Sequence, residues 1–151
     1  MATDDLRLDR QVCFALYAAS RATTQLYRPV LDTLGLTYPQ YLVMLVLWER
    51  GPLTVKDLGA ELDLDSGTLS PVLKRLETAG LVRRIRRTED ERSVEVRLTE
   101  HGTALRERAV SVPRKVAEAT GLDAAELSGL RDSLTTLART IREQRLTADD
   151  L

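Results

Sequence analysis

Apolar residues recur at helical spacing along much of the chain, and the stretches with this period define most of the predicted elements. The first helix is predicted to begin at an N-cap, Asp9, and to carry its apolar positions as far as Leu34, before a stop at Gly35. Pro29 lies inside this pattern, so we expect it to bend or break the helix near its last turn.

The start of the second helix is marked by a capping box. Thr37 and Gln40 have the spacing at which two side chains satisfy each other's backbone N–H groups. From Tyr38 to about Glu49 the sequence is apolar nearly all round, which predicts a helix buried at the centre of the fold.

Two shorter helices joined by a tight turn are predicted next, over Val55–Leu62 and Ser66–Ala79. Each opens on a capping side chain, Thr54 for the first and Asp65 or Ser66 for the second. The second helix has one apolar stripe, formed by Leu69, Val72, Leu73 and Leu76. Its outward face is small, polar and basic, which suits close approach to base edges and contact with phosphates.

Two strands are predicted after these helices, over Leu81–Arg87 and Val94–Leu98. In the second strand apolar residues alternate with Glu95 and Arg97, the period of a strand with one buried face. The polar segment 88–93 joins the two strands as a hairpin. A helix-turn-helix followed by an arginine-rich hairpin is typical of proteins that dock on duplex DNA with one helix in the major groove.

The C-terminal third is predicted to be helical. Thr99 opens a long helix that Pro113 should kink, and a capping box of Asp123 and Glu126 starts a last helix that runs to about Arg145. The apolar stripe of this last helix has no partner in the small central module, which indicates dimerisation. The stripe consists of Leu127, Leu130, Leu134, Leu137 and Ile141.

These elements predict a mainly α fold with a small β-hairpin wing, organised as one integrated domain. We expect residues 37–99 to form a winged helix-turn-helix module, and residues 1–36 and 100–151 to form a helical dimerisation region. The length of 151 residues suits one domain with its own core. A hydrophobic content of 43% and a charged content of 30% are those of a soluble globular protein.

Several features favour a cytoplasmic location. No apolar run approaches the ~20 residues that span a membrane, and the acidic, polar start of the chain does not have the pattern of a signal peptide. The single cysteine fits a reducing compartment.

The charge is distributed unevenly along the chain. The formal net charge is −1, yet eight Lys and Arg residues gather between Lys74 and Arg97. A basic face on a near-neutral protein fits sequence-selective binding of nucleic acid better than unspecific adhesion.

Two motifs carry a resemblance to the MarR family of winged-helix transcription regulators. One is LDSGTLSP at 64–71 with LKRLE at 73–77, and the other is DERS at 90–93 followed by LTEHG at 98–102. The resemblance extends over nearly the whole chain, and the segments around Cys13 and Tyr38 resemble one branch, the organic hydroperoxide resistance regulators. It implies an obligate homodimer that represses a peroxidase gene until a hydroperoxide oxidises a single N-terminal cysteine.

Cys13 is the sensor that this resemblance implies. From composition alone, a small buried hydrophobe is the more ordinary interpretation of Cys13. With Asp9 as the N-cap, Cys13 would lie at the edge of the first helical turn, where the helix dipole favours an anion such as a thiolate. Tyrosine hydroxyls are suitable hydrogen-bond donors to it. Tyr17 lies one turn along the same face, and by resemblance Tyr27 and Tyr38 contact the cysteine from the opposite subunit.

The chemistry expected of such a sensor is oxidation of the thiolate to a sulfenic acid. The chain has no second cysteine to resolve it, so it would condense with a low-molecular-weight thiol or a backbone nitrogen, or proceed to sulfinic and sulfonic acids. Apolar surroundings should favour organic hydroperoxides over hydrogen peroxide.

DNA-binding side chains are predicted on the second short helix and on the hairpin. Arg92, at the hairpin tip, is the candidate for insertion into a narrow A·T-rich minor groove, and the resemblance implies that Asp90 orients it. A dimer is expected to read a pseudo-palindromic, double-stranded operator. The other predicted contacts are Ser66, Thr68, Ser70, Lys74, Arg75, Arg84 and Arg86.

Two other functions stay open at this point. The effector could be a small phenolic ligand in a cleft between the DNA-binding and dimerisation regions of the same fold. A thiol peroxidase with Cys13 as its nucleophile is the alternative from another class, although it would leave the basic hairpin without a role. His101 is the only histidine, so no metal site is expected, and no P-loop or dinucleotide-binding motif implies a cofactor.

Overall fold

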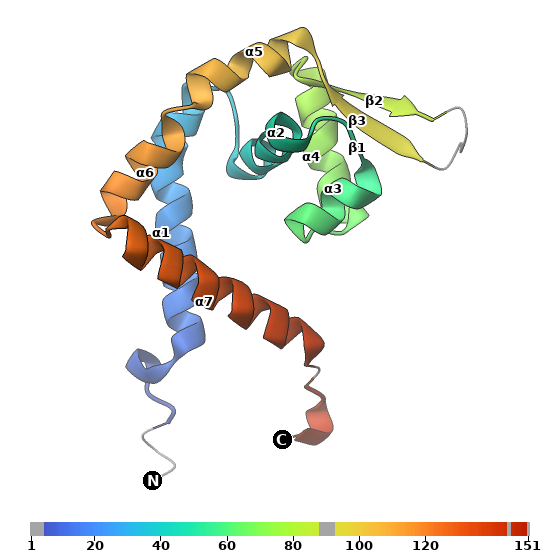
Figure 1. Ribbon diagram of the computed structural model, residues 1–151. Helices are drawn as coiled ribbons and strands as arrows, with labels where there is room; N and C mark the ends of the chain where they lie inside the picture. Colours follow the sequence, from blue (N-terminus) through green and yellow to red (C-terminus); the bar gives the residue numbers. More distant parts are fainter. Residues whose placement is uncertain (1–4, 88–92, 145, 151) are drawn as a thin grey trace. The chain divides into compact units, whose positions relative to one another are not determined.

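The computed structural model describes residues 5–87, 93–144 and 146–150, and the chain divides into two compact units, Met1–Val112 and Pro113–Leu151. The first unit is mainly helical and carries a three-stranded antiparallel sheet (Figure 1). Its elements are η1 (Leu8–Arg10), α1 (Val12–Asp32), α2 (Tyr38–Arg50), β1 (Leu53–Thr54), α3 (Val55–Leu62), α4 (Ser66–Thr78), β2 (Val82–Arg86), β3 (Val94–Leu98) and α5 (Glu100–Ala109). The predicted fold class, mainly helical with a small wing, is confirmed.

The wing has one strand more than the sequence predicted. The sheet order is β1-β3-β2, and β1 pairs with β3 through Leu53 opposite Val96. Two residues are too few to show a strand period, so β1 could be recognised only from its pairing. In the predicted hairpin, Val82 lies opposite Leu98 and Arg84 opposite Val96.

The start of α1 differs from the prediction. The helix begins at Val12 with Gln11 as its N-cap, and no side chain caps it. Asp9 lies in η1 instead, where its carboxylate accepts two hydrogen bonds from the Arg7 guanidinium, at 3.0 and 2.6 Å. The prediction of an Asp9 cap was wrong because a neighbouring cation binds that carboxylate.

The end of α1 agrees with the predicted stop. Gly35 takes a φ of 69°, and the Leu36 N–H donates to the Leu31 carbonyl at 3.1 Å, which closes the helix in a Schellman motif. Pro29 does not break α1, which runs on to Asp32. The fixed φ of proline is compatible with a helix, and the missing N–H removes one backbone hydrogen bond near the helix end.

Helix α2 forms the centre of the core, although it is not buried all round. Both halves of its capping box are present, with the Thr37 N–H donating to Gln40 at 2.9 Å and the Gln40 N–H donating to Thr37 at 3.4 Å. Val43, Met44 and Leu47 are at most 1% exposed, but Leu45 is 37% exposed. The prediction of burial on every side was therefore wrong at Leu45.

Local capping sets the starts of α3 and α4. The Thr54 hydroxyl accepts from the Asp57 N–H at 3.1 Å, and the Asp65 carboxylate accepts from the Thr68 N–H at 2.7 Å. Asp65, rather than Ser66, is therefore the cap of α4. The buried stripe of α4 consists of Leu69, Leu73 and Leu76, with Val72 half-buried.

The turn between these two helices requires a glycine on α3. The Leu64 N–H donates to the Gly59 carbonyl at 2.9 Å, and a Cβ added at Gly59 would lie 2.7 Å from the Leu64 carbonyl oxygen. A side chain at position 59 would force the turn away from α3.

One cluster of contacts, which we call the junction, joins α2, α5 and the base of the wing. It consists of Trp48, Gly80, Leu81, Thr99 and Gly102. The Thr99 N–H donates to Leu81 at 3.1 Å, and its hydroxyl donates to the Gly80 carbonyl and accepts from the Gly102 N–H. The Trp48 indole donates to the Gly102 carbonyl at 2.9 Å.

Glu95 lies on the face of β3 that the sequence predicted to be exposed, yet it is only 9% exposed. Arg97 donates a hydrogen bond to its carboxylate from one side, and Arg87 lies 3.2 Å from it on the other. Two arginine side chains therefore cover Glu95. The hydrogen bond from Arg97, with that from Arg87, holds the pKa of Glu95 below its ordinary value of 4.5.

The C-terminal elements are α6 (Val112–Thr120), α7 (Ala124–Glu143) and η2 (Ala148–Asp150). The predicted long helix is divided in two, since α5 ends at Ala109 and Pro113 lies in the first turn of α6, where a missing N–H costs least. Pro113 thus marks a helix start rather than a kink. The capping box of Asp123 and Glu126 is confirmed, and α7 ends two residues before the predicted Arg145.

None of the residues of α7 is buried in the single chain. In the predicted apolar stripe, Leu130 is 49% exposed, Leu134 39% and Ile141 53%. This stripe is available to another surface.

Replacing Gly102 by alanine is expected to destabilise the protein by about 3 kcal/mol, the upper part of the usual range for overpacking. The added Cβ would lie 2.1 Å from the Leu81 carbonyl oxygen, and the backbone at both positions is held by hydrogen bonds. Chemical denaturation of the variant measures the loss. The matched control is Gly129→Ala on α7, where nothing lies within 4 Å and alanine should stabilise by about 0.5–1 kcal/mol. A stable Gly102→Ala protein would contradict the junction described above.

Replacing Glu95 by glutamine is expected to lower the melting temperature at neutral pH, and the difference from wild type should shrink in acid. A carboxyl whose folded pKa is depressed contributes stability above its unfolded pKa and loses it as the pH falls through the folded value. Melting both proteins at about pH 7 and about pH 3 tests this. Glu118→Gln is the control, because its pair with Arg114 is long, 3.7 Å, and exposed. An equal difference at both pH values would refute the prediction.

Candidate functional site

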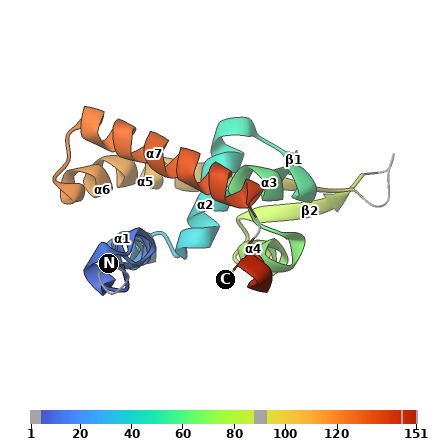
Figure 2. The same ribbon diagram turned by 90° about the horizontal axis from the view of Figure 1, so that it is seen from below.

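The predicted DNA contacts of α4 share its outward surface. Helix α4 itself lies beside β2 (Figures 1 and 2). All of them are exposed: Ser66, Thr68, Ser70, Lys74 and Arg75. The Asp65 cap and the buried Leu69–Leu73–Leu76 stripe fix which surface of α4 faces outward.

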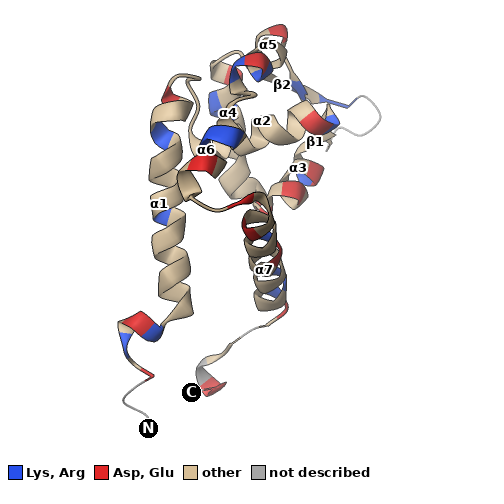
Figure 3. Ribbon diagram, turned by 60° about the vertical axis from the view of Figure 1, so that its left-hand side comes forward, with Lys and Arg blue, Asp and Glu red and all other residues tan. Residues whose placement is uncertain are grey.

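Arg84 and Arg86 come from β2, whose ribbon carries the blue of basic residues (Figure 3). Arg86 is exposed, but Arg84 is held by Glu77 of α4. The Glu77 carboxylate accepts from the Arg84 backbone N–H at 3.0 Å and from its guanidinium at 3.2 Å. These bonds, the backbone one first, keep the pKa of Glu77 below its ordinary value. Glu77 therefore fixes β2 against α4.

Asp90 and Arg92, predicted at the hairpin tip, lie outside the described residues. Their roles stay predictions.

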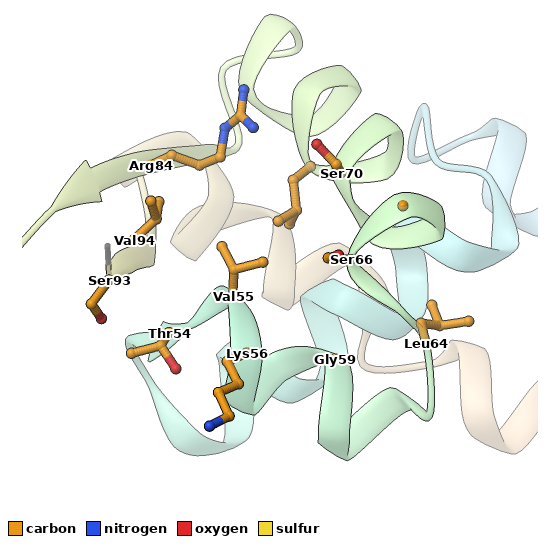
Figure 4. Close-up of a pocket in the computed structure, with 12 residues that line it drawn as sticks. Thr54, Val55, Lys56, Gly59, Leu64, Ser66, Ser70, Arg84, Ser93 and Val94 are labelled. Carbon is orange, nitrogen blue, oxygen red and sulfur yellow. The ribbon is translucent and has the colours of Figure 1, made fainter. Parts of the chain in front are cut away.

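A groove of about 940 Å³ lies between α3, α4 and the wing (Figure 4). Thr54 and Lys56 line it from the α3 side, Ser66 and Ser70 from α4, and Arg84, Ser93 and Val94 from the wing. Three of these residues were predicted DNA contacts: Ser66, Ser70 and Arg84. The sequence did not predict a site role for Thr54, Lys56 or Ser93. Lys56 could have been noticed as a cation directly after the helix cap Thr54.

Cys13 is the second residue of α1 and is exposed in the single chain. Within one chain Cys13 is therefore not a buried hydrophobe. The α1 segment from Val12 to Ser20 contains no charged residue, as its tan colour in Figure 3 shows. Tyr17, one turn after Cys13, is 60% exposed, and the Arg21 guanidinium lies 5.5 Å from its ring centre.

Tyr27 and Tyr38 meet across α1 and α2, and a third ring that the sequence analysis did not include joins them. The ring centres of Tyr27 and Tyr38 are 4.9 Å apart, and Tyr41 lies 5.7 Å from Tyr27 and 6.4 Å from Tyr38. Burial, followed by the neighbouring phenols, raises the pKa of Tyr27 to about 12, and burial also raises those of Tyr38 and Tyr41. All three hydroxyls therefore stay protonated and able to donate at neutral pH. Tyr41 could have been predicted to join this cluster, because it follows Tyr38 by three residues and so lies on the same side of α2.

Cys13 and Tyr27 cannot touch within one chain. Tyr27 follows Cys13 by fourteen residues on the same continuous helix, which places them about 21 Å apart along the axis. The structure thus brings Tyr27 and Tyr38 together. Their contact with Cys13 was predicted from the opposite subunit and stays a prediction.

The described part of the chain holds no group of three or more His, Cys, Asp or Glu side chains arranged to bind a metal ion. No helix in it combines the length and apolar character needed to cross a membrane.

Comparison with known proteins gives consistent matches. The family model for the MarR family matches residues 36–94. The organic hydroperoxide resistance transcriptional regulator of Bacillus subtilis is 48% identical over 93% of this chain and 96% of its own. The regulator TtmR of Methylorubrum extorquens is 48% identical over 89% of this chain and 69% of its own.

Solved structures of transcriptional regulators also resemble this chain in fold. Reduced AbfR of Staphylococcus epidermidis bound to DNA has a TM-score of 0.77 and 37% identity, covering 93% of this chain and 99% of AbfR. AbfR has also been solved in an overoxidised form bound to DNA, with a TM-score of 0.76. With nearly half of its residues identical to a known regulator over almost its full length, this chain belongs to the MarR family of transcriptional regulators and is not an enzyme.

Proposed function

We propose that this chain is a homodimeric, cytoplasmic repressor that binds operator DNA and releases it when an organic hydroperoxide oxidises Cys13. The observation that carries the proposal is the placement of its one cysteine. Cys13 is exposed in the first turn of α1, in a chain that is 48% identical to an organic hydroperoxide resistance regulator. The positive end of a helix is where an anion such as a thiolate is stabilised.

Dimer formation would cover surfaces that one chain leaves open. Leu31 is the only buried residue of α1, and Val12, Phe14 and Tyr17 are 45–65% exposed. Apolar surfaces of this extent mark an interface with another protein surface, here a second copy.

Two-fold symmetry would bring the cysteine to the tyrosines. Ser20 lies midway between Cys13 and Tyr27, so two α1 helices packed antiparallel around Ser20 place each Cys13 beside the partner's Tyr27. Three alanines lie close to this midpoint, and their small side chains allow two helices to approach closely: Ala18, Ala19 and Ala22. Tyr38 would follow, because its ring is packed on Tyr27.

In this arrangement Tyr27 and Tyr38 donate hydrogen bonds to the thiolate from the partner, and Tyr17 donates from the same helix. The thiolate sulfur attacks the terminal oxygen of the hydroperoxide, the O–O bond breaks, and the alkoxide leaves as an alcohol after taking a proton. The resulting sulfenic acid condenses with a low-molecular-weight thiol to give a mixed disulfide and water. The uncharged start of α1 favours organic hydroperoxides over hydrogen peroxide.

The DNA-binding half of the proposal rests on α4 and the wing. Ser66, Thr68 and Ser70 would face base edges, while Lys74 and Arg75 reach phosphates. Arg84 and Arg86 contact the backbone beside the wing, and Arg92, oriented by Asp90, enters the minor groove. Paired recognition helices must lie about one DNA turn (~34 Å) apart to read a pseudo-palindromic operator. A bulky adduct on Cys13 would change this spacing through the α1–tyrosine contacts.

Cys13→Ser is expected to bind operator DNA as the wild type does, but to stay bound when an organic hydroperoxide is added, because serine cannot be oxidised. The test is a gel shift on DNA from upstream of the protein's own gene, with and without cumene hydroperoxide. Adding a thiol reductant to oxidised wild type should restore its binding if a mixed disulfide has formed. Release of Cys13→Ser by the peroxide would refute the proposal.

Tyr38→Phe is expected to slow the oxidation of Cys13 by roughly tenfold, since a hydrogen bond to a charged group contributes about 1.5 kcal/mol or more. The loss of free thiol with time after addition of cumene hydroperoxide gives the rate. The variant keeps the aromatic ring and its packing, so its melting temperature should match wild type. Tyr41→Phe is the comparison, since the proposal assigns no thiolate contact to Tyr41. An unchanged rate in Tyr38→Phe would remove Tyr38 from the sensor.

A further inference from the structure

Tyr17 is held differently from the other tyrosines of the proposed sensor. Tyr27 and Tyr38 pack on each other and on Tyr41, between α1 and α2. Tyr17 is 60% exposed, and the Arg21 guanidinium lies over its ring, 5.5 Å from the ring centre. At this distance a cation is attracted to the electron-rich face of an aromatic ring. The function proposed above gives Arg21 no role.

The order of the side chains along α1 explains this contact. Cys13, Tyr17 and Arg21 follow one another at intervals of four residues, so they lie on one side of the helix. Helical side chains lean toward the N-terminus of their helix. Arg21 therefore leans over the Tyr17 ring, and Tyr17 leans toward the turn that carries Cys13. The phenol stands between the thiol and the cation.

No carboxylate of its own helix lies near Arg21. The other charged residues of α1 are Arg28 and Asp32, and Asp32 follows Arg21 by eleven residues. That separation is about 16 Å along the helix axis, twice the screening length of about 8 Å at physiological salt. The charge of the guanidinium is therefore not neutralised within α1, and it can act on the ring beneath it.

Arg21 is too far from Cys13 to act on a thiolate there directly. Eight residues separate the two, which is about 12 Å along the helix axis. Both side chains are exposed, and over that distance physiological salt screens most of the attraction between exposed charges. An effect of Arg21 on the cysteine has to pass through Tyr17.

A cation over the ring changes Tyr17 as a hydrogen-bond donor in two ways. An exposed side chain that is fixed in one rotamer loses conformational entropy, and a contact that fixes it beforehand lowers the cost of the hydrogen bond that it then makes. The cation also attracts the π electrons of the ring, which leaves the phenol hydrogen more positive and strengthens it as a donor.

We propose that Arg21 is a positioning residue of the sensor, whose guanidinium holds the Tyr17 ring so that the phenol hydroxyl donates to the Cys13 thiolate. The inference rests on the proposed function, in which a hydroperoxide oxidises Cys13. Arg21 touches neither the sulfur nor the peroxide, and it stabilises the thiolate only through Tyr17.

The test is the rate at which cumene hydroperoxide removes the free thiol of the reduced, full-length protein. Arg21→Gln should slow this reaction by about two- to fivefold, the rate ratio that corresponds to an exposed cation–π contact. Arg21→Lys keeps a cation and should recover part of the lost rate. Arg106→Gln is the matched control, because Arg106 is an exposed arginine of α5, and it should react at the wild-type rate.

A double-mutant cycle shows whether the effect passes through the phenol. In a Tyr17→Phe background the hydroxyl is absent, so adding Arg21→Gln should cause no further slowing. A general loss of helix structure would slow the reaction in both backgrounds, and melting temperatures equal to wild type show that each variant is folded.

The outcomes separate the inference from the proposed function. If the peroxide does not oxidise wild-type Cys13, the proposed function fails, and the inference fails with it. If Cys13 is oxidised but Arg21→Gln reacts at the wild-type rate, only the role of Arg21 is overturned. Equal slowing by Arg21→Gln with and without the Tyr17 hydroxyl overturns it as well. Slowing that is confined to the protein with Tyr17, and is partly recovered by Arg21→Lys, supports it.

Discussion

Gly102 lets the first turn of α5 approach the backbone of Leu81 so closely that no side chain fits between them, and the placement of the wing depends on this contact. Leu81 directly precedes β2, and Thr99 directly follows β3, so the junction holds both ends of the hairpin. The Trp48 indole joins the same place to the last turns of α2. The wing is therefore fixed to the central helix of the core, and its strands need no long hydrophobic face of their own.

Carboxylates hold the arginine-rich wing in order. Glu95 lies under Arg87 and Arg97, and Glu77 binds Arg84 from α4. Arginines placed close together without such partners would repel each other and move freely. With these carboxylates present, part of the positive charge of the wing is neutralised by ion pairs within the chain, while Arg83 and Arg86 remain exposed. The number of arginines in the sequence therefore overstates the charge that the wing offers to a phosphate.

The parts of the fold that could be predicted from sequence are those set by contacts a few residues apart. The caps at Thr37, Thr54 and Asp123 depend on a side chain and a backbone N–H three residues later, so a local pattern specifies them. The cap at Asp9 failed for the same kind of reason, because Arg7, two residues before it, binds the carboxylate. Local rules omit such competition between neighbours.

The parts of the fold that could not be predicted depend on contacts between segments that are far apart in the sequence. The burial of Glu95 and the pairing of β1 required β3 to be placed between two strands. Lys56 joined the candidate site only because α3 lies across a groove from the wing, and Tyr41 only because α1 packs on α2. Sequence motifs were enough to identify α4 as the candidate DNA-reading helix and Cys13 as the candidate sensor. Lys56 and Tyr41 could be identified only once the fold was known.

The distance between Cys13 and Tyr27 limits how the proposed sensor can work. Since a single α1 keeps them about 21 Å apart, the proposed contact between Cys13 and Tyr27 requires two copies of the chain. Tyr38 and Tyr41 begin α2, and Trp48 ends it at the junction. A well-packed helix moves as a unit rather than deforming. In the proposed dimer, a group added to Cys13 beside the tyrosines would therefore act at the base of both wings through α2. In the proposed mechanism, the packing that orders the tyrosines thus connects the sensor to the reader without any contact between Cys13 and DNA.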